Sequence, residues 1–153
     1  MLNSILIDAG PLIALFDSSD RYHKGIIAFL KENHYRFIST LAVFTEVSHM
    51  LDFNVCAQRD FYEWVMCKGV IISDINQNDM PRIVNLTEQY AVTSTERTQV
   101  SEGSPLDLPM DFADATLVVT AEKTGIREII SMDRDFDVYR LPGKEHIHNV
   151  YTH

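Results

Sequence analysis

Short apolar segments typical of β-strands alternate with helical segments along this chain. The predicted strands cover residues 3–7, 37–39, 70–72 and 128–131, with a further edge strand expected at 147–151. Between them, apolar residues recur at helical spacing over about 12–16, 22–33, 41–51, 57–67, 79–90 and 110–123. Such alternation is the signature of a parallel sheet whose strands are joined by crossover helices. We therefore expect an α/β fold built on a mainly parallel sheet.

The composition sets limits on domain number and on nucleic-acid binding. With 153 residues, of which 46% are hydrophobic, the chain is expected to form a single domain over residues 1–153. Its 13 basic and 22 acidic residues give a formal charge of −9, the wrong sign for gripping nucleic acid through a broad basic face. Any contact with nucleic acid must therefore be local, mediated by metal or helped by a partner.

The sequence carries no pattern of export, membrane insertion or disulfide bonding. Cys56 and Cys67 form no CxxC pattern, so we expect reduced thiols and no zinc site. The N-terminus lacks a basic region before its apolar residues and contains Asp8 in their midst. No run approaches the ~18 to 20 apolar residues of a membrane span. These features predict a cytoplasmic protein.

Acidic residues follow the first and last of the main predicted strands. Asp8 comes directly after residues 3–7, and Asp133 and Asp135 come just after residues 128–131. In sheets with crossover helices, ligands collect outside the carboxyl ends of the strands. The surroundings of Asp8, ILIDAGPLIAL, are apolar, and burying an unpaired carboxylate there is costly, so a functional role is favoured. Asp135 is equally typical of a solvated turn.

Three further acids belong to predicted helices. Asp111 and Asp114 are three residues apart near the start of a helix and therefore share a face. Asp114 lies in the apolar segment MDFADATLVV, which again favours function. Asp111 is equally typical of a helix start, where the macrodipole favours an acid. Glu46, on the helix after the second strand, is equally typical of an exposed helix surface.

Carboxylates that converge on one point raise each other's pKa and lower stability unless a cation is present. Magnesium or manganese fits this need, because both prefer oxygen ligands and are commonly held by a few carboxylates. Such an ion activates water, orients it toward a scissile phosphate and neutralises charge on the leaving oxygen. A metal site of this kind would let an acidic protein act on a polyanion.

Four segments follow one another over nearly the whole chain: LIDAGPLIALFD, TLAVFTEV, LPMDFADATLVVTAEKTG and SMDRDFDVYR. In this order they resemble the PIN-domain nucleases, and most closely the VapC-like toxins of bacterial toxin–antitoxin pairs. The resemblance implies a three-layer α/β/α sandwich with a central mainly parallel sheet. It also implies RNA cleavage with one or two Mg²⁺ or Mn²⁺ ions, and frequent homodimers.

The resemblance also assigns roles to particular residues. The family's four acidic positions, which would be catalytic, fall on Asp8, Glu46, Asp114 and Asp133. By resemblance the three aspartates are metal ligands, and Glu46 is a ligand directly or through water. Asp135 would be an auxiliary carboxylate, and Thr40 lies where a polar residue orients water or phosphate. Asp111 is kept as an auxiliary residue with an open role.

Two features depart from the family pattern. About fifteen residues are inserted before the helix of Asp114, within a polar stretch at about 92–108 that we expect to be an exposed, flexible loop. The insertion either gates an RNA groove or is a neutral surface excursion, and the second is favoured. Ser131 stands where the family often has threonine, and either hydroxyl would serve.

The sequence thus predicts a metal-dependent endoribonuclease that acts on an RNA substrate and is the toxin partner of a small antitoxin protein. One rival is a phosphatase in which Asp8 attacks phosphorus. Such enzymes usually have a second aspartate two positions on, where this chain has Gly10. The other rival is a non-catalytic module that keeps the acidic pocket and binds metal or RNA.

Overall fold

The computed structural model describes residues 1–91 and 109–152, and the loop predicted at about 92–108 lies outside them. Within the described residues the strands form one sheet, in the order β3-β2-β1-β4-β5, and every neighbouring pair is parallel. The strands are β1 (Asn3–Ile7), β2 (Tyr35–Thr40), β3 (Val70–Ser73), β4 (Glu128–Ile130) and β5 (His148–Asn149). The α/β fold, its parallel sheet and the edge strand near the C-terminus are confirmed.

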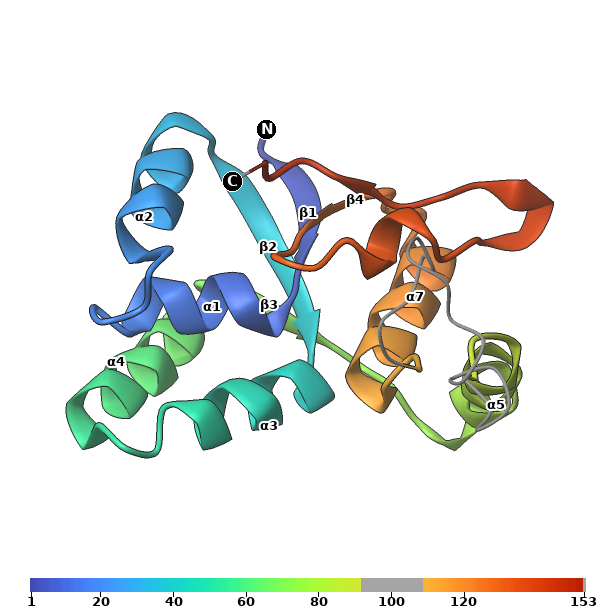
Figure 1. The fold of residues 1–153 in the computed structure, drawn as a ribbon, viewed down its shortest axis with the longest axis horizontal. Helices are drawn as coiled ribbons and strands as arrows, with labels where there is room; N and C mark the ends of the chain where they lie inside the picture. Colours follow the sequence, from blue (N-terminus) through green and yellow to red (C-terminus); the bar gives the residue numbers. More distant parts are fainter. Residues whose placement is uncertain (92–108, 153) are drawn as a thin grey trace, which may run out of the picture.

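Helices cover both faces of this sheet. They are α1 (Ala9–Phe16), α2 (His23–Glu32), α3 (Leu41–Met50), α4 (Val55–Met66), α5 (Met80–Gln89) and α7 (Phe112–Thr124). Figure 1 shows α1, α2 and α4 on one side of the sheet and α5 with α7 on the other, while α3 packs against both α1 and α7. The predicted three-layer α/β/α sandwich is confirmed.

Capping side chains explain why some helices begin slightly away from their predicted bounds. Asn54 Oδ1 accepts from the Ala57 N–H at 3.1 Å, so α4 begins two residues earlier than the apolar spacing predicts. Asp111 caps α7, which therefore begins at Phe112 and not at about residue 110. Pro81 is accommodated in the first turn of α5, as expected for a residue without a backbone N–H.

Helix α7 is the most deeply buried element of the described chain. Every residue from 113 to 121 is buried, because the helix lies between the sheet and α5. Arg82 of α5 forms a two-pronged ion pair with Glu122 of α7, with Nη2 at 2.7 Å from Oε1. Gly125 ends the helix with a φ of 80°, a left-handed conformation that favours glycine. The first turn of α7, which carries Asp114, is thereby fixed against the sheet.

The chain order creates a switch point between β1 and β4. From β1 the chain moves outward through β2 to β3, and it later returns to the other side of β1 as β4. Connections leave β1 and β4 in opposite directions, and in α/β sheets this is where ligand-binding crevices open beyond the carboxyl ends of the strands. Asp8 directly follows β1, and Ser131 directly follows β4, at this edge.

Two further predictions concerned the cysteines and the membrane. Cys56 and Cys67 are free thiols, as expected, and both are exposed, on α4 and at its C-terminal end. None of the helices within residues 1–91 and 109–152 is both long and apolar enough to cross a membrane.

Candidate metal centre

Asp8 is fixed at the end of β1 by three hydrogen bonds. Its backbone N–H donates to the Ile130 carbonyl of β4 at 3.0 Å. Its Oδ1 accepts from the Ala9 N–H at 2.8 Å and caps α1, while Oδ2 accepts from the Ser131 hydroxyl at 3.0 Å. The residue is only 5% exposed. This carboxyl group therefore has one defined position on the carboxyl edge of the sheet.

Asp114 is fixed in the first turn of α7 by a buried phenol. The Tyr139 hydroxyl donates to Asp114 Oδ2 at 2.8 Å, and the ring of Tyr139 packs edge-on against Phe136 and Tyr90. The Asp114 N–H donates to Asp111 Oδ1 at 2.8 Å. Asp114 is 8% exposed, and its Oδ1 accepts no hydrogen bond from the described residues. One oxygen of Asp114 is thus held and the other is available to a ligand.

Burial is the main reason why both carboxyl groups are hard to ionise. It raises the pKa of Asp8 from 3.8 to about 7, an effect that the hydrogen bonds from Ala9 and Ser131 only partly offset. Burial likewise raises the pKa of Asp114 from 3.8 to about 8, with further contributions from the charges of Asp8 and Asp111. The two acids are therefore electrostatically coupled, although β1 and α7 are far apart in the sequence.

Glu46 and Asp133 form the exposed side of the same acidic group. The pKa of Glu46 is raised, first by partial burial and then by the charges of Asp111 and Asp133. Asp133 also raises the pKa of Asp8, and its backbone N–H donates to the Ser131 hydroxyl oxygen at 3.0 Å. Both side chains are exposed. Each of the four acids predicted to be catalytic thus interacts electrostatically with at least one other.

The three predicted auxiliary residues are placed in different ways. Asp111 is the N-cap of α7, the helix-start role that was one of its two alternatives, and its charge also acts on Asp114. Asp135 is half-buried and helps to raise the pKa of Tyr139, so it lies close to the group. Thr40 is fully buried, and its hydroxyl caps α3 and lies 2.8 Å from the Thr116 hydroxyl. That Thr40 orients water or phosphate stays a prediction.

The donor chemistry of this group fits a hard divalent cation. Within residues 1–91 and 109–152, no three Asp, Glu, His or Cys side chains are close enough together to form a ready-made metal site. The available donors are carboxylate oxygens, the type that Mg²⁺ and Mn²⁺ prefer, and two of these carboxyl groups are buried with no basic partner among the described residues. A cation offsets the cost of ionising such groups.

Two residues that organise the acids, Tyr139 and Asn149, escaped the sequence analysis, which noted the Ser131 hydroxyl but not its partner. Tyr139 and Ser131 each donate to a buried carboxylate. Asn149 of β5 holds the backbone of Ser131 on both sides, accepting from its N–H at 3.2 Å and donating to its carbonyl at 2.9 Å. The sequence does hold a signal for Tyr139, which lies three residues after Phe136, a spacing typical of two buried aromatic residues. A buried tyrosine needs a hydrogen-bond partner for its hydroxyl, and a nearby carboxylate is one candidate.

Residues 5–141 match the model of the PIN domain family, and the chain belongs to this family. Among solved structures it is similar to Mycobacterium tuberculosis VapC20, described as a sarcin-ricin loop cleaving toxin. The TM-score is 0.62 at 18% sequence identity, and the match covers 88% of this chain and 93% of that chain. At this identity the likeness establishes a shared fold. No curated protein sequence matches the chain.

Proposed function

We propose that this protein is a divalent-metal-dependent endoribonuclease that hydrolyses RNA phosphodiester bonds. The proposal rests on two buried carboxyl groups, Asp8 and Asp114, held at the carboxyl edge of the sheet within electrostatic range of Glu46 and Asp133. Membership of the PIN domain family supports nuclease chemistry. The cleavage of the sarcin-ricin loop ascribed to VapC20 supports RNA as the substrate class.

In this proposal Asp8, Asp114 and Asp133 bind Mg²⁺ or Mn²⁺, and Glu46 does so directly or through water. A bound ion supplies the positive charge that carboxylates and a phosphate both need, and lowers the pKa of water. The rest of the work is orientation by the protein. The Ser131 and Tyr139 hydroxyls each hold one carboxylate oxygen, and each acid keeps lone pairs for a further partner.

We further propose that the protein acts in the cytoplasm as a toxin, as a homodimer, and that a small antitoxin protein neutralises it. Support comes from the resemblance to VapC-like sequences and from the fold shared with VapC20. Induced expression of the wild type should therefore arrest growth of a host cell, whereas the Asp8→Asn variant should not. Growth arrest by both would contradict a toxic effect based on cleavage.

Cleavage of end-labelled structured RNAs tests the enzymatic proposal. Wild-type protein with Mg²⁺ or Mn²⁺ should give discrete fragments, and EDTA or the Asp8→Asn substitution should abolish them. The Asp60→Asn variant is the matched control, because Asp60 is an exposed acid on α4 outside the acidic group. Cleavage that persists in EDTA, or that Asp60→Asn and Asp8→Asn reduce equally, would contradict the proposal.

Two further outcomes would identify the rival functions. Trapping of a phospho-aspartate at Asp8 would indicate the phosphatase. The residue types disfavour it, because position 10 is glycine and the second aspartate that such enzymes usually have is missing. Intact metal binding with uncut RNA in every pool would indicate the non-catalytic module.

A further inference from the structure

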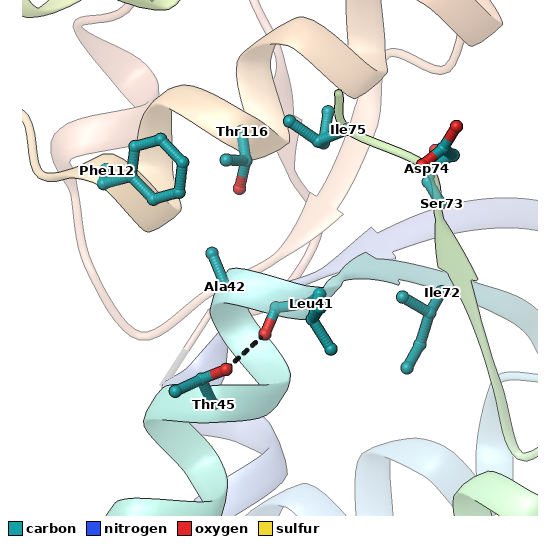
Figure 2. Close-up of a pocket in the computed structure, with 9 residues that line it drawn as sticks. All are labelled: Leu41, Ala42, Thr45, Ile72, Ser73, Asp74, Ile75, Phe112 and Thr116. Atoms are coloured by element: carbon teal, nitrogen blue, oxygen red, sulfur yellow. Dashed lines mark hydrogen bonds between the residues drawn. The ribbon is translucent and has the colours of Figure 1, made fainter. Parts of the chain in front are cut away.

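A pocket of about 440 Å³ lies beside the acidic group, between α3, β3 and α7. Figure 2 shows the nine residues of its walls, among them Leu41, Thr45, Ile72, Asp74, Phe112 and Thr116. The volume falls within the range of roughly 300–1,000 Å³ typical of small-molecule sites. None of the roles described above accounts for this pocket.

The pocket is largely apolar, and its large side chains are exposed. Leu41 and Phe112, the first residues of α3 and α7, are 62% and 51% exposed, and Ile72 is 37% exposed. Apolar side chains that gather around a concave surface mark a binding site more often than isolated ones do. Hydroxyl groups of Thr45, Ser73 and Thr116 interrupt this lining, and the acidic residue Asp74 also lines the pocket.

The helices that build the pocket also carry the acids. Phe112 directly follows Asp111, and Thr45 directly precedes Glu46. The floor is tied to the sheet by the 2.8 Å contact between the Thr116 and Thr40 hydroxyls. An RNA strand bound at the acids would therefore pass this pocket. The nucleotide next to the scissile phosphate would then lie at the pocket mouth.

We propose that this pocket binds one unstacked nucleobase of the RNA, with Phe112 as its stacking platform. The inference rests on the proposed function and deepens it by naming a determinant of substrate choice. Ribose and phosphate are polar, so the faces of the bases are the apolar surfaces that RNA offers to an apolar pocket. Proteins read unpaired bases by stacking them on aromatic rings and by hydrogen bonding their edges.

Each part of the lining has a function in this arrangement. The Phe112 ring stacks on the base face, and Leu41 and Ile72 give the base apolar contacts. Thr45 donates its hydroxyl hydrogen to the Leu41 carbonyl at 2.8 Å, which leaves the oxygen as an acceptor for a base amino group. This acceptor favours a base whose amino group faces α3, so the pocket should discriminate between bases.

Binding of short RNAs to protein with an intact acidic group tests this proposal, with Ca²⁺ in place of Mg²⁺ as an oxygen-binding cation and gels to verify that the RNA stays uncut. Fluorescently labelled five-nucleotide RNAs of A, C, G or U are compared with an abasic chain of equal length. Phe112→Ala should weaken binding of the preferred base roughly tenfold, and Phe112→Tyr should retain it. Affinity for the abasic chain should be the same in all three proteins.

Phe53→Ala provides the matched control, because Phe53 is a 64% exposed phenylalanine in the turn between α3 and α4, outside the pocket. Wild-type cleavage of RNA, with Phe112→Ala and Phe53→Ala binding every RNA alike, would overturn the base pocket while leaving the nuclease intact. A Phe112→Ala variant that binds RNA normally but loses a dimer in sedimentation would reassign the pocket to an interface between two copies. Absence of both RNA binding and cleavage in the wild type would overturn both proposals together.

Discussion

The two halves of the acidic group are built differently. Asp8 and Asp114 are buried and each accepts a hydrogen bond from a buried hydroxyl, whereas Glu46 and Asp133 are exposed. Burial raises the pKa of the first pair strongly, and the exposed pair adds its charge to that effect. In the proposed metal site, two ligands would thus be fixed in advance, and the other two would be free to adjust around an ion or a phosphate.

The largest expected difference between the halves is in RNA cleavage. Asp8→Asn and Asp114→Asn remove fixed ligands, so each should cost more than the roughly 10–100-fold typical of losing an outer partner of a metal ligand. Glu46→Gln should cost about tenfold, because an exposed side chain that binds directly or through water is more easily replaced by solvent. Single-turnover cleavage rates in Mn²⁺ measure this, and a larger loss in Glu46→Gln would reverse the comparison.

The buried half should also control how stability varies with pH in EDTA. The folded pKa values of Asp8 and Asp114, about 7 and about 8, lie above the ordinary value of 3.8, so the folded state binds these protons more tightly. Their contribution to the free energy of unfolding is fully present below about pH 4 and is lost as the pH rises through 7 to 8. At about 1.4 kcal/mol per pKa unit, the loss should be roughly 4 kcal/mol for Asp8 alone and larger for the two acids together.

Urea unfolding at several pH values in EDTA checks this slope. Asp8→Asn should flatten it, and Asp60→Asn, which changes an exposed acid on α4, should not. Adding Mn²⁺ should restore stability at pH 8, because a ligand that binds the folded state stabilises it by mass action. A stability that stays flat from pH 5 to 8 in EDTA would show that the two acids are not held as a coupled buried pair.

The smallest predicted effect concerns the phenol that orients Asp114. Tyr139→Phe removes the hydrogen bond to Oδ2 and should weaken Mn²⁺ binding about tenfold, while the ring keeps its packing. Titration calorimetry gives the affinity directly, without reference to cleavage. Tyr62→Phe on α4 is the control, and equal affinities in the two variants would reduce Tyr139 to a packing role.

Local sequence patterns were enough to predict the fold. Strands β1 and β3 and the alternation with helices follow from apolar spacing. The order of the motifs, through the family resemblance, predicted that Asp8, Glu46, Asp114 and Asp133 belong to one site. The remaining part depends on contacts between distant residues. Ser131 meets Asp8 across 123 positions and Thr116 meets Thr40 across 76, and nothing in a local pattern specifies such a pairing.

The exposed aromatic at the pocket shows a second limit. Phe112 lies in the apolar segment MDFADATLVV, which predicts a buried helix face, and residues 113–121 are buried as that pattern requires. Phe112 itself is exposed because Asp111, the residue before it, caps the helix. Phe112 is therefore the first helical residue and lies at the outer end of α7. The direction of a side chain at a helix start depends on the cap, which periodicity alone does not reveal.

Anomalous diffraction from a crystal soaked in Mn²⁺ tests the central claim most directly. A manganese peak is expected between Asp8 and Asp114, with Asp133 or Glu46 drawn toward it, and no peak is expected in an Asp8→Asn crystal treated identically. A peak elsewhere on the surface, or none at a concentration that supports RNA cleavage, would contradict a shared metal site built on the two buried carboxylates.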